Sequence, residues 1–403
     1  MEIRSALPVA VLIGCVLGAA AAGADDTNAP ASSVAARGIV SEAAAAVSEV
    51  SWDIPVVRNE PVQKFVRIFT TGSQQDAYAL YLKRSGRYEG MIRAKLRERG
   101  MPEDLLYLSM IESGFNTTAR SHAQAVGLWQ FIEDTGERYG LRVDSYVDER
   151  KHPEKSTDAA LRYLTDLHEQ FGSWYLAAAA YNTGEGRVAR VMKATTGSQR
   201  GNDADFWRIR ARLPRETREY VPLMVAAALI GKEPGKYGLE GVKRWLPLEM
   251  EEVEVPAATK LATVAEAVGV GEAELKRMNP HLVRAMTPPG GKPYRVRIPR
   301  GRGDQYAANF ATVQRVALAR AEVERKEEQR KVAERREEQR KVAARRQQEQ
   351  RRVASGRRHT VRNGESLWTI ARRYDTTVKR LQAANGLGRR NSIRPGQKLR
   401  IPA

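Results

Sequence analysis

The sequence predicts a mainly α-helical protein, in which a compact helical domain is followed by two small βααβ modules joined by a long charged helix. From Pro102 to about Leu229, apolar residues recur at helical spacing and alternating strand patterns are absent. Residues 253–300 and 359–402 each read as strand, helix, helix and strand in the same order, which indicates an internal repeat. Between the two copies lies a charged segment with a near ten-residue repeat, which is typical of a solvated helix.

The N-terminus has the pattern of an export signal. Arg4 gives a short positive start, and the residues from Ala6 to Ala22 are apolar and small. The sequence Ala22-Gly23-Ala24 suits cleavage by signal peptidase after Ala24. We therefore expect an exported protein of the periplasm or cell envelope.

The only cysteine, Cys15, lies inside this apolar run. Leu12-Ile13-Gly14-Cys15 also fits a lipoprotein processing box, so a lipid anchor on Cys15 is an alternative to simple cleavage, and an uncleaved anchor is a third. With cleavage after Ala24 the mature chain has no cysteine, which excludes disulfides and thiol chemistry.

The net charge of +19 is concentrated near the C-terminus. Residues 315–358 hold sixteen Lys and Arg against eight Asp and Glu, and residues 359–403 hold ten against two. Such charge suits nucleic acid, anionic lipid or an acidic cell-wall polymer, and the export signal excludes nucleic acid. The repeat's valines are too sparse for a coiled-coil seam, so we expect a spacer helix in a monomer, with a weak oligomerisation helix as the alternative.

The sequence predicts neither a metal site nor a cofactor. The histidines show no ligand spacing and there is no cysteine pair. They are His122, His152, His168, His281 and His359.

The segment from Pro102 to Gly114 predicts a helix that carries an acid. Pro102 suits the first helical position, and the helix should stop near Gly114. Leu105, Leu108 and Glu112 share one face. A carboxyl group that ends an apolar stripe is desolvated, which raises its pKa and makes it a proton donor near neutral pH. The plain alternative is a Glu that points into water.

Two later segments favour the functional interpretation. Residues 125–131 bring the Gln130 amide and aromatic rings together on an apolar turn. Residues 176–184 form a small-residue helix that ends in Tyr181-Asn182 before a glycine, and its alanines allow close helix packing. Buried Tyr, Asn and Gln need hydrogen-bond partners, and a carboxyl group facing a sugar would be one. Taken singly, each could be structural.

Together, these motifs are similar to a known family. Glu112-Ser113, Gly127-Leu128-Trp129-Gln130 and Ala180-Tyr181-Asn182 resemble the lytic transglycosylases with a goose-type lysozyme fold, and more closely the membrane-bound lytic murein transglycosylase D family. Further matching stretches are Phe131-Ile132, Thr135-Gly136, Asp148-Glu149-Arg150, Ser156-Thr157-Asp158-Ala159-Ala160 and the run from Arg215 to Pro222. The resemblance covers most of residues 60–300.

The resemblance implies a lysozyme-like fold and a role for each matched residue. Glu112 would be the sole catalytic acid/base with Ser113 beside it, Tyr181 would hydrogen-bond it, Asn182 would contact the sugar, and Gly127, Leu128, Trp129 and Gln130 would form the substrate-binding segment. The implied reaction cleaves the MurNAc-β-1,4-GlcNAc bond of peptidoglycan without water and leaves a 1,6-anhydro-MurNAc end. A lysozyme-like hydrolase would need a further carboxylate such as Glu133, Asp134 or Glu185. A catalytically inert cell-wall-binding scaffold is the other alternative.

The C-terminal copy resembles LysM modules, which bind chains that contain N-acetylglucosamine. The matching residues are Thr360-Val361, residues 364–371, Leu381, residues 385–387 and residues 393–402. The resemblance implies glycan contacts from Gly364, Glu365, Ser366, Leu367, Ile393, Pro395 and Gly396. Glu365 stands where Asp is usual, and Asn363 where a basic residue is common.

The earlier copy is similar to a degenerate LysM module. It keeps Leu275 and Asn279-Pro280 but lacks the Gly-(Asp/Glu)-(Ser/Thr)-Leu turn. Both sugar binding and a purely structural role remain open for it.

Seven segments follow from these observations. We expect a signal peptide at 1–24, a disordered tether at 25–51, a helical extension packed on the catalytic domain at 52–101, the lysozyme-like catalytic domain at 102–240, a degenerate LysM-like module at 241–302, a basic helical linker at 303–358 and a LysM domain at 359–403. The expected partners are peptidoglycan glycan strands and, through the basic segments, an anionic envelope surface.

Overall fold

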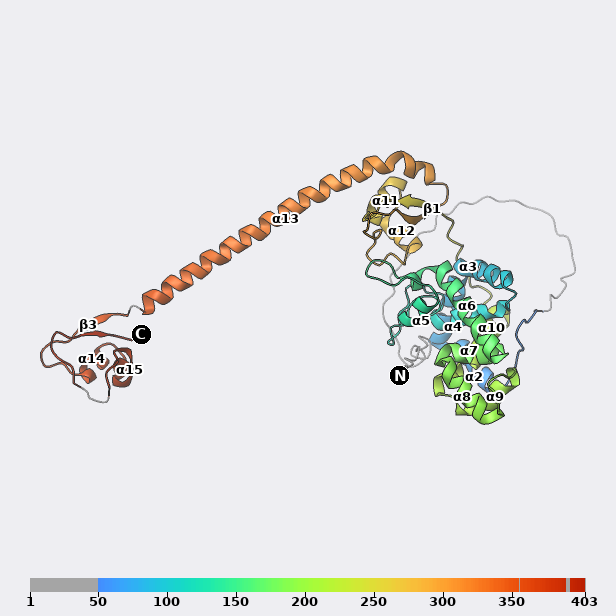
Figure 1. Ribbon diagram of the computed structural model, residues 1–403, viewed down its shortest axis with the longest axis horizontal. Coiled ribbons are helices and arrows are strands. Elements are labelled where there is room, and N and C mark those ends of the chain that lie inside the picture. The colour runs from blue at the N-terminus through green and yellow to red at the C-terminus, as the bar shows by residue number, and fades with distance from the viewer. Residues whose placement is uncertain (1–49, 355, 389–391, 403) are drawn as a thin grey trace. The chain divides into compact units, whose positions relative to one another are not determined.

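The computed structural model of the chain describes residues 50–354, 356–388 and 392–402. The signal peptide expected at 1–24 and nearly all of the tether expected at 25–51 lie outside these residues. The described residues form two compact units that divide after Val313. Figure 1 shows that helices dominate both the larger unit and the connection to the smaller one, so the expected mainly α fold is confirmed.

The helical domain is built around one hydrophobic core. Its elements are α2 (Glu60–Phe69), α3 (Gly72–Glu98), η1 (Glu103–Leu105), α4 (Leu106–Ser113), α5 (Glu133–Arg138), η2 (Glu149–Lys151), α6 (Pro153–Phe171), α7 (Trp174–Thr183), α8 (Glu185–Thr196), α9 (Asp203–Ile209), η3 (Arg210–Arg212), α10 (Arg215–Lys232) and η4 (Pro234–Tyr237). Helices α4 and α7 both pack against α10. The residues that carry chemistry lie on these three helices and on the loop between α4 and α5.

Helix α4 ends where the sequence predicts. Gly114 adopts a left-handed backbone with φ of 56°, and its N–H donates to the carbonyl of Met110 over 2.8 Å. Every residue of α4 is buried, Glu112 included. The plain alternative of a Glu112 that points into water is therefore wrong.

Helix α10 contains an internal proline, Pro222, and the fold compensates for it locally. Proline has no N–H, so the carbonyl of Arg218 four residues earlier loses its usual helical donor. The Nε of Arg210 donates to that carbonyl instead, over 2.8 Å. The helix can therefore continue past Tyr220, which lies between these two positions.

The first small module has the predicted order of elements. It comprises β1 (Met250–Val255), α11 (Leu261–Val268), α12 (Glu272–Met278) and β2 (Tyr294–Pro299), and its two strands pair antiparallel with Met250 opposite Pro299. Its hydrophobic core also takes in Val147, a residue of the helical domain that is 0% exposed. The module and the helical domain therefore share buried side chains.

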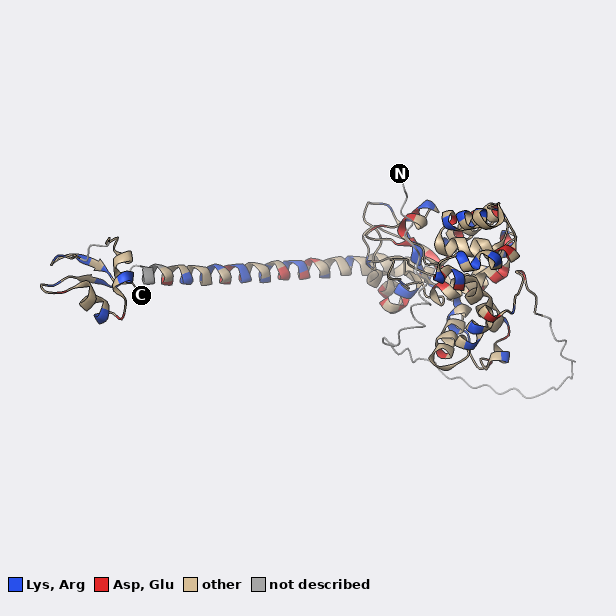
Figure 2. Ribbon diagram, turned by 90° about the horizontal axis from the view of Figure 1, so that it is seen from below, with Lys and Arg blue, Asp and Glu red and all other residues tan. Residues whose placement is uncertain are grey.

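The second unit contains the C-terminal module. It contains β3 (Arg358–Thr360), α14 (Leu367–Arg373), α15 (Val378–Ala384) and β4 (Lys398–Arg400), with its own small core. Helix α13 (Gly303–Ala354) begins in the first unit and continues into the second, and the ribbon in Figure 2 shows stretches coloured for basic and for acidic residues alternating along it. Among the described helices, none is both long and apolar enough to cross a membrane.

One asparagine confirms the internal repeat in atomic detail. In the first module the Asn279 side chain donates to the carbonyls of Leu275 and Arg297, and its Oδ1 accepts from the N–H of Arg297. In the second module Asn385 makes the same three hydrogen bonds with Leu381 and Arg400. Each asparagine therefore ties the second helix of its module to the last strand.

Candidate active site

Glu112 is the best candidate for the acid of this site. Its side chain lies near the end of α4 and is 1% exposed. Oε1 accepts a hydrogen bond from the hydroxyl of Tyr220, while Oε2 is buried and has no hydrogen-bond partner among the described residues. Burial raises the pKa of Glu112 to about 8, so the carboxyl group is protonated at neutral pH. Oε2 is therefore the atom from which a proton can be delivered.

Two residues of α10 set the electrostatics around Glu112, and sequence reasoning assigned them no role. The charge of Glu216 adds to the rise in the pKa of Glu112, whereas the hydrogen bond from Tyr220 opposes it. Burial also raises the pKa of Tyr220 well above its usual value, so its hydroxyl stays a donor. Both residues lie in the stretch from Arg215 to Pro222 that resembles the family, and that resemblance was the only sequence signal for them.

The expectation that Tyr181 hydrogen-bonds Glu112 is wrong. The Tyr181 hydroxyl donates to the carbonyl oxygen of Trp129 over 2.8 Å, and Tyr220 is the tyrosine that contacts Glu112. Tyr181 is 6% exposed, and its ring packs on Tyr163 with centroids 5.1 Å apart. It holds the loop that carries Trp129 rather than the acid itself.

Asn182 lies at the end of α7 beside the first turn of α10. Its Nδ2 donates to Glu216 over 3.3 Å, and its Oδ1 accepts from the Thr217 hydroxyl over 2.8 Å. The amide is 2% exposed. Asn182 therefore reaches Glu112 only through Glu216, whose charge acts on the acid.

The loop between α4 and α5 holds the predicted segment 127–130. Gln130 has a left-handed backbone with φ of 48°, and its Nε2 donates to the carbonyl of Gly127 over 2.8 Å. Its Oε1 is buried and unpartnered among the described residues, as is Oε2 of Glu112. Leu128 and Trp129 are 0% exposed, and the Trp129 indole donates to Thr157 over 3.0 Å. Gln130 thus has an acceptor to offer a ligand, whereas Leu128 and Trp129 are anchors.

Ser113 connects the acid's helix to this loop. Its hydroxyl donates to the carbonyl of Leu128 over 3.0 Å, and Ser109 one turn earlier donates to the same carbonyl over 3.1 Å. Oγ of Ser113 also accepts a hydrogen bond from the N–H of Asn116 over 3.2 Å. The contacts of Ser113 position the loop, and none of them is to Glu112.

The carboxylates considered for a hydrolase lie in other surroundings. Glu133 and Asp134 are exposed at the start of α5. Glu185 accepts from Arg138 over 3.4 Å and from Tyr163 over 3.3 Å. Among the described carboxylates, Glu216 is the one whose charge affects the pKa of Glu112.

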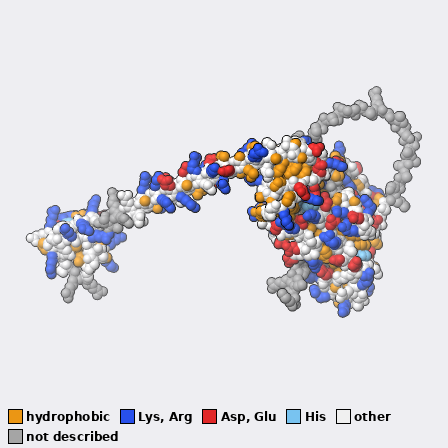
Figure 3. Space-filling view, turned by 45° about the horizontal axis from the view of Figure 1, so that its top comes forward, with side chains coloured by type: hydrophobic (Ala, Val, Ile, Leu, Met, Phe, Trp, Pro, Cys, Tyr) orange, Lys and Arg blue, Asp and Glu red, His pale blue; other side chains and the backbone are white. Residues whose placement is uncertain are grey.

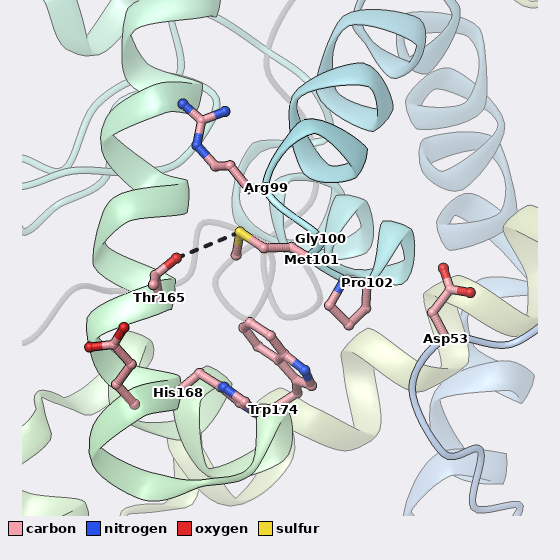
Figure 4. Close-up of a pocket in the computed structure, with 9 residues that line it drawn as sticks. Asp53, Arg99, Gly100, Met101, Pro102, Thr165, His168 and Trp174 are labelled. Carbon is pink, nitrogen blue, oxygen red and sulfur yellow. Dashed lines mark hydrogen bonds between the residues drawn. The ribbon is translucent and has the colours of Figure 1, made fainter.

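A large open hollow lies away from these residues. It has a volume of about 650 Å³, and its lining includes Arg99, Thr165, His168 and Trp174. Figure 4 shows the His168 and Trp174 rings on one side of it, and these rings stack with centroids 3.9 Å apart. The hollow shares no residue with the site around Glu112, so we assign it no part in the chemistry.

The predicted glycan residues of the C-terminal module lie on two adjoining turns. Val361 and Gly396 link these turns through hydrogen bonds between Val361 N and Gln397 O over 2.9 Å and between Gly396 N and Val361 O over 2.8 Å. Gly364, Ser366, Pro395 and Gly396 are exposed, Ile393 is half-buried and Leu367 is buried. The turns can therefore offer backbone groups and small side chains to a sugar.

Glu365 has a structural position in this module. Its carboxylate accepts from the N–H of Arg362 over 2.9 Å, from His359 over 2.6 Å and from Arg373. These partners lower the pKa of Glu365 to about 2. Its oxygens are occupied by contacts within the module, which leaves the glycan contact expected of Glu365 without support in the structure.

Comparison with known families assigns three parts of the chain. The Transglycosylase SLT domain family matches residues 89–203, and the LysM domain family matches residues 359–402. A third family, described as "Lytic transglycosylase MltD, LysM-like domain", matches residues 249–315. These matches cover the part of the helical domain that carries Glu112, and both small modules.

Individual relatives carry corresponding names. The chain is 33% identical over 317 residues to membrane-bound lytic murein transglycosylase D of Escherichia coli K12, a match that covers 78% of this chain and 63% of the relative. It is 33% identical over 129 residues to membrane-bound lytic murein transglycosylase C of Klebsiella pneumoniae, covering 28% of this chain and 35% of the relative. An inactive mutant of lytic transglycosylase Slt from Pseudomonas aeruginosa matches with a TM-score of 0.30 and 28% identity, over 36% of this chain and 24% of that one.

Proposed function

Because the chain belongs to the MltD-type lytic transglycosylases, as its sequence motifs predicted, we propose that it cleaves the MurNAc-β-1,4-GlcNAc bond of peptidoglycan non-hydrolytically. The chain spans about three fifths of the length of the Escherichia coli relative, so the activity of the whole protein is inferred from its own site. The buried carboxyl group of Glu112 carries the proposal, because its raised pKa keeps it protonated and its Oε2 has no hydrogen-bond partner among the described residues.

The proposed reaction needs a single carboxyl group. Glu112 donates its proton to the glycosidic oxygen as the bond to C1 of MurNAc breaks and an oxocarbenium-like state develops. The resulting carboxylate then takes the proton of the C6 hydroxyl of the same sugar, and O6 bonds to C1 to close the 1,6-anhydro ring. Intramolecular attack has effective molarities that reach roughly 10⁵ M or more, so the C6 hydroxyl outcompetes water when it is well placed.

The surroundings of Glu112 support this double use. The raised pKa keeps the proton available for the first step, and the Tyr220 hydrogen bond stabilises the carboxylate that the first step leaves. Oε1 of Gln130, which has no partner among the described residues, would accept a hydrogen bond from a sugar N–H or hydroxyl group.

The remaining parts of the chain fit a cell-wall enzyme. The LysM domain would hold glycan strands that contain N-acetylglucosamine, and the name of the Escherichia coli relative supports an association with the membrane of the cell envelope. Export after cleavage at Ala24, and lipidation of Cys15 as its alternative, remain sequence-based proposals.

The first prediction concerns the products of Glu112 chemistry. Digestion of purified peptidoglycan by the soluble chain should release anhydro-muropeptides, as read by mass spectrometry. Glu112→Gln should release none, because an amide cannot donate the proton. Glu185→Gln is the matched control: it replaces another carboxyl group, held by Arg138 and Tyr163, and should leave the products unchanged.

Each other result has a defined meaning. Products with a reducing end, one water heavier, would contradict the transglycosylase and favour a hydrolase, with Glu216 as the carboxylate to test for activation of water. Undigested peptidoglycan that nevertheless retains the protein would instead support a binding scaffold.

A further inference from the structure

The LysM-like module forms a continuous structure with the helical domain. The N–H of Asp148 donates to the carbonyl of His281 over 2.9 Å, and the N–H of Val283 donates to the carbonyl of Tyr146 over 3.0 Å. The Nε of Arg284 donates to the carbonyl of Ser145 over 2.8 Å. Figure 1 places the module, with β1, α11 and α12, beside the loops that lead into α6. The module therefore fixes the backbone of residues 145–148.

Buried side chains reinforce this junction. Arg297 on β2 is 6% exposed, and its Nη2 lies 3.0 Å from Nε2 of His152 and also donates to Glu154. The rings of His152 and His281 are 4.6 Å apart. Burial, with the charge of Arg297 beside it, lowers the pKa of His281 to about 3, so this histidine is neutral at neutral pH. Removing the partners of a buried guanidinium leaves an uncompensated buried charge, so separating Arg297 from Glu154 and the two histidine rings would cost free energy.

The fixed segment in turn holds the loop of the active site. Asp148 accepts from the Nε of Arg150 over 2.8 Å, and the other end of that guanidinium reaches the carbonyls of Gln124 and Phe131, each over 3.4 Å. Gln124 and Phe131 bracket the segment that carries Gln130. Arg150 is itself 6% exposed.

The loop also meets the backbone of Arg150 directly. Gly127 has φ of 87°, and a Cβ added there would overlap the carbonyl oxygen of Arg150. Gln130 has φ of 48° in the same loop, a backbone that persists in a residue with a side chain only when its surroundings impose it. The contacts from Arg150 are part of those surroundings.

We propose that the LysM-like module is a positioning element of the active site, and that Arg150 is the positioning residue through which it presets the loop carrying Gln130. This role rests on the proposed function only in that Gln130 is taken to contact the sugar. It assigns the module an activity-linked task that requires no glycan binding by the module itself.

The test compares two arginines on the same strand of the module. Arg297→Met removes the buried guanidinium at the junction, and Arg295→Met, two residues earlier and with a side chain 74% exposed, is the matched control. Hydrogen exchange of the free full-length chain should become about tenfold faster at residues 124–131 in Arg297→Met, with no change in α10, because loop opening is local. Arg295→Met should match the unsubstituted chain.

Kinetics on soluble MurNAc-GlcNAc chains provide the second measurement. Arg297→Met and Arg150→Met should raise KM and lower kcat/KM about tenfold, since small displacements of a binding group are costly. In both variants the basic limb of the pH profile of kcat/KM should stay at the same pH, because Glu112, Tyr220 and Glu216 are unchanged. Arg150→Lys should have a kcat/KM between those of the unsubstituted chain and Arg150→Met. One ammonium group can pair with Asp148, but it cannot also reach the carbonyls of both Gln124 and Phe131.

Several results would overturn the proposal. Faster exchange confined to the module and residues 144–150, with 124–131 at its original rate, would show that the junction does not hold the loop. A lower kcat with unchanged KM in both Met variants would indicate loss of folded enzyme rather than loss of positioning. The exchange arm needs no substrate, so it decides the proposal even if the chain proves to have no transglycosylase activity.

Discussion

The two oxygens of Glu112 have different surroundings, and the difference suits its proposed role, first as an acid and then as a base. Oε1 accepts from Tyr220, and Oε2 has no partner among the described residues. The hydrogen bond and the burial act on the pKa in opposite directions, with burial the larger effect. The site therefore balances a proton held at neutral pH against a carboxylate stable enough to form during turnover.

This balance predicts opposite pH shifts for two substitutions. Tyr220→Phe removes the hydrogen bond that lowers the pKa of Glu112, so the basic limb of kcat/KM should move to higher pH. Glu216→Gln removes the charge that raises this pKa, so the limb should move to lower pH. In the unsubstituted enzyme the limb should lie near pH 8. Tyr220→Phe should also reduce kcat roughly 10- to 100-fold, since a hydrogen bond to a charged group contributes about 1.5–3 kcal/mol. Shifts in the same direction would contradict the assignment.

Glu112 should also reduce the stability of the fold at neutral pH. A carboxyl group whose pKa is raised on folding destabilises the folded state once pH exceeds its unfolded value, because only the unfolded chain can ionise it. Glu112→Gln should therefore stabilise the chain by roughly 3 kcal/mol at pH 7 and by almost nothing near pH 4, since each pKa unit corresponds to 1.36 kcal/mol. Urea unfolding of both forms at the two pH values measures this, and an equal gain at pH 4 and pH 7 would contradict it.

At the scale of elements, the loop between α4 and α5 is the least regular part of the site and the most constrained. Carbonyl groups within it accept from Ser109, Ser113, Tyr181 and Arg150. A loop held from α4, α7 and the segment before α6 can keep an uncommon backbone such as that of Gln130.

The close approach of this loop to Arg150 predicts a strong effect at Gly127. Gly127→Ala should lower the free energy of unfolding by several kcal/mol and abolish activity, because the new Cβ would overlap the Arg150 carbonyl. Gly197→Ala is the control: Gly197 also has positive φ, 83°, but nothing lies within 4 Å of an added Cβ, so it should cost only about 1 kcal/mol. Thermal unfolding and the peptidoglycan digest measure both, and equal losses would mean that backbone conformation alone explains Gly127.

Local sequence predicted the elements of the site better than the contacts between them. Pro102 and Gly114 mark the ends of the helical segment that carries Glu112, and the helical phase places the acid on a buried face. Tyr220 is 108 residues away from Glu112, and no local pattern indicates that its hydroxyl reaches the acid. The resemblance implied that role for Tyr181, and helical phase could not test it, because phase fixes the face of a side chain and not the atom that it reaches.

For the repeated module too, the sequence predicted the elements but not their contacts with the rest of the chain. The order of strands and helices indicated the shared plan from sequence, and the structure adds that Asn279 and Asn385 hydrogen-bond the equivalent backbone groups in the two modules. The attachment of the first module to residues 145–148 had no sequence signal, since backbone hydrogen bonds can be made by any residue except proline.

At the scale of the whole chain, the excess of basic residues lies in a different part of the sequence from Glu112. Residues 359–403 hold ten basic residues against two acidic ones, and on the face in view in Figure 3 blue Lys and Arg side chains gather over the C-terminal module. The acid of the site is buried, and exposed charges are screened within about 8 Å at physiological ionic strength. Attachment to an anionic wall should therefore depend on salt, whereas the chemical step should not.

The last prediction separates these two properties. Binding of the Glu112→Gln chain to purified peptidoglycan sacculi, which it cannot digest, should weaken severalfold as sodium chloride rises from about 0.05 to 0.5 M, because screening shortens the reach of the basic residues. Over the same range, kcat of the unsubstituted chain on short soluble glycans should stay constant, because Glu112 is shielded from the solvent. Co-sedimentation and product analysis measure the two. Salt-independent sedimentation would mean that neutral sugar contacts on the LysM turns, with Gly364 and Gly396 among them, hold the wall without help from charge.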